Sequence, residues 1–592
     1  MSKIKINRNI LWAGSFVNEL AALGVKYVSL SPGSRNTPLT LAFANNKKIK
    51  SFVHIDERSS GFFALGLAKA SNTPVAVVCT SGTATAELYP AIVEAYQQRV
   101  PLIICTADRP PELLNRGANQ TINQNNLYRN HIRWFYDTGL PEPDLKNIRS
   151  LKLAAANAVY CSSVKSRGPV HINFPFKKPF EPKAYTNEID TKVLTFAESP
   201  LSLNEIPCAP NDSKISNEKW FLNIVKYFIK FERGLIIVGP DNYNPEFLHN
   251  CEKLSQKLSY PILADGTSQL RFGRHRKQNI ITNYDAFLRS VKFSFNHQPD
   301  IIIQFGRTVT SKGLDTFLNN CNAPRFMVNE FGDWFDPGDK ALAAYACKPY
   351  IFCKEMNAIL NSNGYSRKSS SWLKEFNSEE DVSLKLKSEI IDRSAYPNES
   401  RVINEIINAV PNSCQIMISN SMPVRDFDYF ASSSRKNIIV YNNRGASGID
   451  GITSTALGIA AAIKKPTVLI TGDLAFYYDL NGLLTAKNYK IPLVIVLINN
   501  NGGGIFEVLP ISNYGDIFKK YFLVPHNLEF KNLVKAFGGR YKLITGWKNL
   551  HSSLTSAFSL KQFSVLEIKT NAVESLKTRR KFWKSVANNL SK

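Results

Sequence analysis

Short apolar runs alternate with segments of helical periodicity over most of the chain. In its last third, the runs at residues 467–472 and 493–498 are rich in β-branched side chains and contain no charged residue. Such runs are typical of strands that are buried on both faces of a parallel sheet. The segment between them, from about Leu480 to Lys490, has room for one crossover helix. We therefore expect a βαβ unit whose two strands end at the same edge of the sheet, where open α/β sheets bind ligands.

The same alternation predicts an α/β protein with three doubly wound parallel-sheet domains. The predicted divisions are a first domain at 1–185, a linker at 186–215, a middle domain at 216–361, a second, partly helical linker at 362–397 and a third domain at 398–592. The predicted strands lie at 27–30, 52–55, 75–79, 101–105 and 170–173 in the first domain, at 234–239, 261–264, 301–306 and 325–329 in the middle domain, and at 415–419, 438–441, 467–472, 493–498 and 564–568 in the third.

A carboxylate and a side-chain amide directly follow the two strands of the βαβ unit. Asp473 follows the first strand, and Asn500 comes just after the second. Behind Asn500 stand Gly502, Gly503 and Gly504, whose backbone can approach a phosphate closely. Oxygen ligands of this kind suit Mg²⁺. The pattern therefore predicts a site for a metal ion and a diphosphate, although a lone Gly-Asp would more often be an ordinary turn at a strand end.

Length and composition favour a multidomain protein of the cytoplasm. The chain has 592 residues, of which 44% are hydrophobic. Its longest apolar runs hold about eight residues, too few to cross a bilayer, and residues 1–24 lack the apolar block of a signal peptide. The nine cysteines are scattered singly without a CxxC pair, which argues against disulfides or a zinc site and for a reducing compartment. We expect a cytoplasmic protein with no membrane insertion.

The charge balance is strongly basic, with 73 Lys and Arg residues against 48 Asp and Glu residues and a net charge of +25. A nucleic-acid binder is one interpretation of such an excess. The basic residues are spread along the chain, however, and the densest cluster, at 577–584, fits a solvated helix face. Attraction of small anions explains the sign without a nucleic-acid partner.

Several longer motifs resemble one family of thiamine-diphosphate enzymes. They are SPGSRNTPLT at 31–40, HIDERSSGFFALGLAK at 54–69, TSGTATAELYPA at 80–91, TADRPPELLNRGANQTI at 106–122, NRGASGIDG at 443–451, TGDLAFYYDLN at 471–481 and INNNGGGIFEVLP at 498–510. Together they are similar to the 2-succinyl-5-enolpyruvyl-6-hydroxy-3-cyclohexene-1-carboxylate synthases. The middle domain matches weakly, mainly at 304–306 and 310–312.

The resemblance implies a transferase of menaquinone biosynthesis that uses thiamine diphosphate and Mg²⁺, with Mn²⁺ as an alternative ion. Such an enzyme decarboxylates 2-oxoglutarate on the cofactor and adds the resulting succinyl-semialdehyde carbanion to isochorismate. The first domain then binds the pyrimidine of the cofactor and the third binds its diphosphate. The active unit is at least a homodimer, and pairing of two dimers is left open. No nucleic-acid partner is implied.

The resemblance also assigns roles to individual residues. Glu57, which follows a predicted strand at the start of a helix, matches the catalytic glutamate that donates to the pyrimidine; its alternative role is that of a first-turn residue favoured by the helix dipole. Ile449 matches the apolar residue that bends the cofactor, or else is a plain core side chain. The implied cofactor residues are Pro32, Glu57, Thr80, Ser421, Gly448, Ile449, Leu474, Ala475, Asn500 and Gly503, and the implied metal ligands are Asp473, Asn500 and the Gly502 carbonyl.

Both implied substrates are dicarboxylates, so a cationic pocket is expected, with Arg preferred because its planar fork binds a carboxylate through two hydrogen bonds. Ile505 and Phe506 would form an apolar wall. One departure concerns Gly313, which follows Lys312 where some relatives carry a second basic residue. The implied substrate residues are Ser34, Arg35, Arg109, Gln120, Lys312, Ser421, Arg425, Arg444, Ile505 and Phe506.

Other functions compete with this one. An acetolactate-synthase-like carboligase or decarboxylase would share Glu57, Asp473 and Asn500 but has no use for so many arginines. A non-catalytic relative that serves as a binding or regulatory module is a second alternative, against which the intact Glu57 and metal ligands argue. A basic RNA-binding protein is the third.

Overall fold

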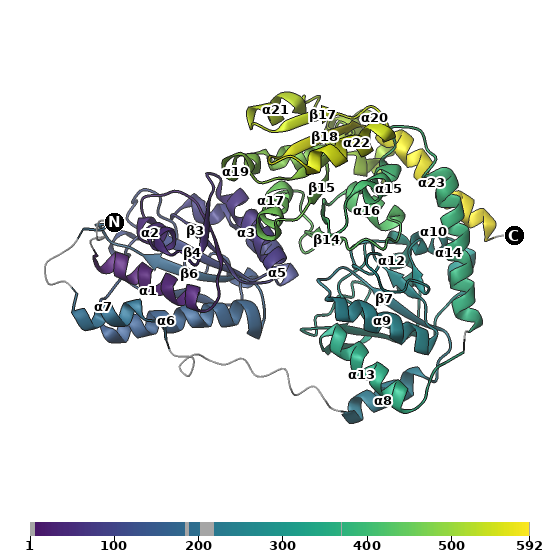
Figure 1. Ribbon diagram of the computed structural model, residues 1–592, viewed down its shortest axis with the longest axis horizontal. Helices are drawn as coiled ribbons and strands as arrows, with labels where there is room; N and C mark the ends of the chain where they lie inside the picture. The colour runs from purple at the N-terminus through teal and green to yellow at the C-terminus, as the bar shows by residue number, and fades with distance from the viewer. Residues whose placement is uncertain (1–5, 184–188, 202–217, 369, 591–592) are drawn as a thin grey trace.

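A computed structural model describes residues 6–183, 189–201, 218–368 and 370–590. It contains three six-stranded sheets in which every strand pairing is parallel. The strand orders are β2-β1-β3-β4-β6-β5, β12-β11-β10-β7-β8-β9 and β14-β13-β15-β16-β18-β17. The predicted fold class is therefore confirmed. In Figure 1 the first domain lies at one side, and the middle and third domains are stacked at the other.

The first domain is built around β1 to β6. Its strands are β1 (Tyr27–Leu30), β2 (Lys50–Val53), β3 (Val75–Cys79), β4 (Leu102–Asp108), β5 (Phe135–Asp137) and β6 (Val170–Pro175). Its helices are α1 (Arg8–Ala22), α2 (Thr37–Asn45), α3 (Glu57–Ser71), α4 (Thr83–Glu87), α5 (Tyr89–Gln98), α6 (Leu145–Tyr160) and α7 (Thr191–Glu198). Helix α7 falls inside the expected linker 186–215, yet Val193 and Ala197 are buried in the core of this domain. Of the expected linker, the structure describes residues 189–201, and the other residues lie outside the described part of the chain.

The middle domain is built around β7 to β12. Its strands are β7 (Gly234–Val238), β8 (Ile262–Ala264), β9 (Ile280–Ile281), β10 (Ile301–Phe305), β11 (Arg325–Asn329) and β12 (Ala341–Ala346). Its helices are α8 (Glu218–Phe228), α9 (Pro245–Leu258), α10 (Tyr284–Leu288), α11 (Val291–Asn296), α12 (Lys312–Asn319) and α13 (Pro349–Ser362). Helix α14 (Ser371–Ile390) occupies the second expected linker and places Trp372 and Phe376 in the core of this domain.

The third domain is built around β13 to β18. Its strands are β13 (Gln415–Ile418), β14 (Ile439–Asn442), β15 (Thr467–Gly472), β16 (Val494–Asn499), β17 (Arg540–Leu543) and β18 (Ser564–Lys569). Its helices are α15 (Glu399–Ala409), α16 (Met422–Phe430), α17 (Ile452–Ile463), α18 (Asp473–Tyr478), α19 (Leu483–Tyr489), α20 (Gly515–Phe518), α21 (Phe530–Ala536), α22 (Trp547–Phe558) and α23 (Ala572–Asn589). The last helix, α23, packs against α10 and α14 of the middle domain, as both ribbon views show.

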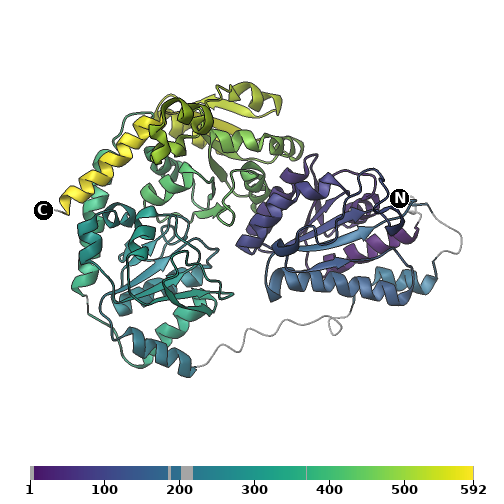
Figure 2. The ribbon, with the colours of Figure 1, turned by 180° about the vertical axis from the view of Figure 1, so that it is seen from behind.

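Helices α3 and α17 join the first and third domains through one continuous core. They touch backbone to backbone, because a Cβ on Gly66 would lie 2.0 Å from the carbonyl oxygen of Thr455, and one on Gly458 would lie 2.1 Å from that of Phe63. Figure 2 shows the first domain meeting the third along this contact. The packing fixes how the ends of the first and third sheets lie relative to each other within one chain.

Candidate functional site

The ends of β15 and β16 form the centre of the site. The two strands pair in parallel, with Gly472 opposite Ile498. Asp473 therefore begins α18 at the same edge at which Asn500 follows β16. The connection between them contains α18 and α19, the second of which lies where the crossover helix was expected. The predicted meeting of Asp473 and Asn500 at one sheet edge is confirmed.

Asp473 is a buried carboxylate with a fixed orientation. Its side chain accepts hydrogen bonds from the backbone N–H groups of Leu474 at 2.7 Å and Gly502 at 3.0 Å. Nε2 of His526 lies 3.2 Å from its Oδ2 atom. Burial raises the pKa of Asp473 above its ordinary value, against the effect of His526 and of these backbone bonds. A cation placed beside such a carboxyl group would stabilise its charged form.

Asn500 has one satisfied end and one free end. Its Nδ2 atom donates to Oε1 of Glu399 at 3.0 Å, whereas its Oδ1 atom is buried without a hydrogen-bond partner. A buried polar oxygen without a partner costs free energy, unless a bound ion or ligand pairs with it. Glu399 in turn pairs with Arg579 of α23 at 2.7 Å. Although burial acts to raise it, the pKa of Glu399 is held below its ordinary value by Arg579 and by hydrogen bonds from Asn500 and Thr570.

The glycines after Asn500 are needed for close packing. A Cβ on Gly502 would lie 2.1 Å from the carbonyl oxygen of Leu523, and one on Gly503 would lie 2.4 Å from that of Phe522. Gly502 also has a φ of 147°, in the range that other residues rarely adopt. The segment 502–504 is thereby held against residues 522–524, with its backbone beside Asp473.

A cavity of about 340 Å³ opens above these residues. All of its lining residues belong to the third domain, between Glu399 and Phe506. Ser421, which lines it at the start of α16, has a φ of 71°, a strained conformation of the kind that clusters at functional sites. The predicted site residues that line this cavity are Ser421, Arg425, Arg444, Ile449, Asp473, Leu474, Ala475, Asn500, Gly502, Gly503, Ile505 and Phe506.

The cavity is cationic on one side. Arg425 and Arg444 both line it, and burial together with the nearby charge of Arg444 lowers the pKa of Arg425. Arg425 donates to the carbonyl oxygen of Ser421 at 2.6 Å. Two like charges held this close favour a bound anion.

A second group of predicted residues gathers at the carboxyl edge of the first sheet. There a Cβ on Gly33 would lie 2.4 Å from Cβ of Thr80, and Arg109 donates to the hydroxyl of Ser81 and, at 2.5 Å, to the carbonyl oxygen of Asn119. Burial lowers the pKa of Arg35 to about 10, and the nearby charge of Arg109 is the second cause. The predicted residues of this edge are Pro32, Ser34, Arg35, Thr80, Arg109 and Gln120, and none of them lines the third-domain cavity.

Glu57 is the first residue of α3 and is half-buried. The helix begins there because Asp56 caps it, accepting from the backbone N–H of Ser59 at 3.1 Å. Burial raises the pKa of Glu57, and the nearby Asp56 and Glu87 raise it further. The carboxyl group is therefore biased toward the protonated form that can donate a hydrogen bond.

Lys312 lies apart from both groups. It begins α12 with a side chain that is 71% exposed and pairs with Asp315 at 2.7 Å. The glycine after it is structural, because the Gly313 N–H donates to Asp285 and a Cβ there would lie 2.6 Å from the Asp285 carbonyl oxygen. A larger basic residue at Gly313 would displace α10.

Comparison with known proteins decides the family. Domain models of thiamine pyrophosphate enzymes match in order along the chain: the N-terminal TPP binding domain at residues 13–127, the middle domain at 213–418 and the C-terminal TPP binding domain at 428–568. A Bacillus cytotoxicus protein named 2-succinyl-5-enolpyruvyl-6-hydroxy-3-cyclohexene-1-carboxylate synthase is 38% identical over 587 residues, covering 97% of this chain and 96% of the relative. The chain belongs to this synthase family. A Haloquadratum walsbyi protein of the same name is 37% identical over 609 residues, with 97% of each chain covered.

Solved structures agree on the fold. The benzoylformate decarboxylase of Polynucleobacter necessarius superposes with a TM-score of 0.69 over 95% of this chain and 98% of its own, at 16% identity. The thiamine diphosphate-dependent 4-hydroxybenzoylformate decarboxylase of Rhodococcus jostii gives 0.68 over 94% and 99%, also at 16%. At this identity the likeness concerns architecture alone, which this member of the synthase family shares with both decarboxylases.

Sequence reasoning missed the residues that support the site from behind. Glu399, Asp426 and Asn420 line the cavity of this synthase-family chain, and Arg579 binds both Glu399 and Asp426. These residues come from different helices and from a strand end, so no local spacing connects them. The one available signal was Arg579 itself, in the basic cluster 577–584 of α23. The interpretation of this cluster as a solvated helix face is wrong for Arg579, which is 2% exposed.

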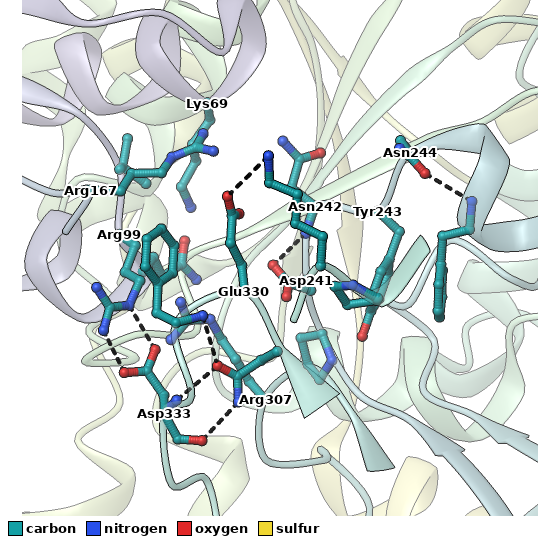
Figure 3. Close-up of a pocket in the computed structure, with 18 of the residues that line it drawn as sticks. Lys69, Arg99, Arg167, Asp241, Asn242, Tyr243, Asn244, Arg307, Glu330 and Asp333 are labelled. Atoms are coloured by element: carbon teal, nitrogen blue, oxygen red, sulfur yellow. Dashed lines mark hydrogen bonds and ion pairs between the residues drawn. The ribbon is translucent and has the colours of Figure 1, made fainter. Parts of the chain in front are cut away.

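A second cavity, of about 350 Å³, lies where the three domains meet. Figure 3 shows Lys69 and Arg99 of the first domain facing Asp241, Glu330 and Asp333 of the middle domain. Arg99 donates to both carboxylate oxygens of Asp333, at 2.6 and 2.5 Å. Among the described residues, none of the cofactor, metal or substrate residues that the synthase resemblance implies lines this second cavity.

Proposed function

We propose that this protein decarboxylates 2-oxoglutarate with thiamine diphosphate and joins the succinyl-semialdehyde unit to isochorismate. The product would be 2-succinyl-5-enolpyruvyl-6-hydroxy-3-cyclohexene-1-carboxylate, for menaquinone biosynthesis. The supporting observation is the similarity over nearly the whole chain to relatives that carry the name of this synthase. It favours this activity over that of an acetolactate-synthase-like carboligase.

The third domain, 398–592, would hold the diphosphate and the metal, and the first, 1–185, the pyrimidine. The unpartnered Oδ1 of Asn500 beside the buried Asp473 carboxylate fits a hard cation, with the Gly502 carbonyl as third ligand. We assign Mg²⁺, with Mn²⁺ as the alternative. Leu474, Ala475, Gly448 and Gly503 would contact the diphosphate end, with Ile449 against the cofactor rings. Bound thiamine diphosphate supplies a nucleophilic carbon and an electron sink.

Glu57 would direct the proton of its carboxyl group toward the pyrimidine of the cofactor. The pyrimidine would lie between Pro32 and Thr80. The raised pKa of Glu57 supports this role, because a carboxyl group must be protonated in order to donate. Arg425 and Arg444 would bind substrate carboxylates in the third-domain cavity, with Ser421 beside them and Ile505 and Phe506 as the apolar wall. The site would be completed by residues of a first domain, namely Ser34, Arg35, Arg109 and Gln120. The middle domain would add Lys312.

We further propose that the active unit is a homodimer, in which the third-domain cavity of one chain faces the first-domain edge of the other. Two observations support this arrangement. Within one chain, no described first-domain residue lines the cavity. In addition, apolar side chains near both groups are exposed, among them Ile55 at 73%, Tyr477 at 53% and Tyr521 at 65%. Surfaces of this kind mark protein interfaces.

A mixing experiment tests the shared site. Glu57→Gln and Asp473→Ala chains, each of which should have little activity alone at limiting thiamine diphosphate, would be co-refolded in equal amounts. Heterodimers then contain one site with both residues intact, so about a quarter of wild-type activity is expected at most. No recovery of activity, although native mass spectrometry shows mixed dimers, would contradict a site shared between chains.

The proposed reaction is tested directly. Purified protein would be incubated with thiamine diphosphate, Mg²⁺, 2-oxoglutarate and isochorismate, and the product identified by mass. Replacing 2-oxoglutarate by pyruvate tests the acetolactate-like alternative in the same assay. Turnover with pyruvate but not with 2-oxoglutarate would reverse our conclusion.

We place the protein in the cytoplasm. The eight cysteines that the structure describes are all buried and free, which fits a reducing compartment. In the described part of the chain, no helix is long and apolar enough to cross a membrane.

A further inference from the structure

The loop after β14, residues 443–448, brings third-domain residues to the cavity. Arg444 lies on it, and Ile449 follows it directly; both line the cavity. The loop has no regular secondary structure to fix it, and Ser447 has a φ of 63°. Something outside the loop must therefore determine where Arg444 points.

Glu94 of α5, in the first domain, binds this loop through its backbone. Its Oε1 atom accepts from the N–H of Gly445 at 2.8 Å, and its Oε2 atom accepts from those of Ala446 at 2.7 Å and Ser447 at 3.2 Å. Glu94 is only 3% exposed. A buried carboxylate that receives several backbone N–H groups makes charge-assisted bonds, which are roughly twice as strong as neutral ones.

The loop packs directly on α5 beside this carboxylate. A Cβ on Gly445 would lie 2.8 Å from Cβ of Gln97, 2.9 Å from Cγ of Gln98 and 3.0 Å from Oε1 of Glu94. Only glycine therefore fits at position 445 without moving the loop or the helix.

Two further side chains hold the ends of the loop. Lys69, at the far end of α3 from Glu57, donates to the carbonyl oxygen of Asn442 and, at 2.8 Å, to Oδ1 of Asn443. Asn420 donates to the carbonyl oxygens of Asn443 and Gly448, both at 2.7 Å. Burial lowers the pKa of Lys69 to about 7, and the charge of Glu94 counteracts this effect. Figure 3 shows Lys69 at the meeting point of the domains.

We propose that Glu94 is a positioning residue, through which the first domain sets the loop 443–448 and thereby aims Arg444 into the cavity of its own chain. The first domain would then serve two sites: its Glu57 edge completes the partner's cavity, and its Glu94 shapes the cavity of its own chain. This inference rests on the proposed substrate role of Arg444. The alternative is that Glu94 only packs α5 against the third domain.

Glu94→Gln separates these roles, because the amide keeps the shape but has one acceptor oxygen in place of two and no charge. The first readout is amide hydrogen exchange of residues 443–449 in the protein without substrates or cofactor. Loss of the charge-assisted bonds should speed exchange by about ten- to a hundredfold there. Glu574→Gln, which removes an exposed carboxylate from α23, is the matched control and should change nothing in that segment.

The second readout is a double-mutant cycle on kcat/KM. Glu94→Gln and Arg444→Ala should each lower kcat/KM by about ten- to a hundredfold, and the double variant should resemble Arg444→Ala alone. Gly445→Ala, which pushes the loop off α5, should behave like Glu94→Gln. Gly546→Ala is its control, since a Cβ there meets nothing within 4 Å.

The outcomes distinguish the positioning role of Glu94 from the substrate role of Arg444. Unchanged exchange in both Glu94→Gln and Gly445→Ala, or effects of Glu94 and Arg444 that multiply, would overturn the positioning role. Faster exchange together with normal kcat/KM in Arg444→Ala would overturn the aiming of Arg444 and its substrate role, while the clamp on the loop itself would stand.

Discussion

The Nδ2 atom of Asn500 donates to Oε1 of Glu399 at 3.0 Å, and this bond leaves the oxygen of this cavity-lining amide buried without a partner. The orientation is enforced, because a carboxylate can only accept and so selects the NH₂ side of the amide. Glu399 is itself fixed by Arg579. The oxygen proposed as a metal ligand is thus prearranged by a chain of contacts that ends on the last helix.

Asn500→Ala should weaken Mg²⁺-dependent binding of thiamine diphosphate by about ten- to a hundredfold, because it removes one ligand oxygen and one of the hydrogen bonds that hold Glu399. Asp473→Ala should have a similar effect. Calorimetric titration of cofactor at saturating Mg²⁺ measures both. Asn589→Ala, an exposed amide on α23, is the control. Unchanged affinity in both site variants would contradict the metal assignment.

Glu57→Gln should lower kcat by about 10²- to 10⁴-fold, the range for loss of a positioned acid or base. Cofactor affinity should change little, because the diphosphate end is held by the third domain. Single-turnover kinetics with 2-oxoglutarate, beside a binding titration, separates the two effects. Near-normal turnover would rule out the assigned role.

Arg444→Ala and Arg109→Ala should each lower kcat/KM by about ten- to a hundredfold, because charged hydrogen bonds contribute about 1.5–3 kcal/mol. Arg444→Lys should recover part of the loss, since it keeps the charge but not the two-bond fork. Steady-state kinetics with each substrate varied in turn measures the effect. Normal values for both substrates in both alanine variants would make these arginines structural.

Asp479 should give the stability of the protein a specific pH dependence. It is buried at the contact of the first and third domains, where it accepts from Ser454 and, at 3.2 Å, from the Ser59 hydroxyl. Burial raises its pKa to about 6. A raised carboxyl pKa means that the folded protein binds this proton more tightly than the unfolded chain does, so its contribution to stability falls as pH rises through about 6.

Asp479→Asn removes this titration and keeps the hydrogen bonds, because the serine hydroxyls can accept from an amide. Between pH 5 and 7, the free energy of unfolding of the wild type should therefore fall by about 1 kcal/mol relative to the variant. Denaturant titrations at the two pH values provide the measurement. A constant difference between the proteins would show that Asp479 does not titrate in this range.

The sequence by itself determined the three-sheet plan through its central strands. Residues 75–79 and 467–472 were predicted with the bounds that β3 and β15 have, because strands buried on both faces form apolar runs without charged residues. The four strands that it did not reveal, β5, β9, β12 and β17, are all outermost in their sheets. Edge strands are short or partly exposed, so they need no continuous apolar run and their pattern resembles that of loops.

The sequence also determined the pair Asp473 and Asn500, because parallel strands must bring their carboxyl ends to one edge. Only the tertiary structure decided what stands behind them. Glu399 and Arg579 are 180 residues apart in the chain, and Glu94 lies 351 residues before Gly445. Each of these partners satisfies a buried polar group of the other, and burial arises only when elements distant in the sequence pack together. A local pattern carries no trace of such a pairing, so the clamp on the loop 443–448 could be seen only in the folded chain.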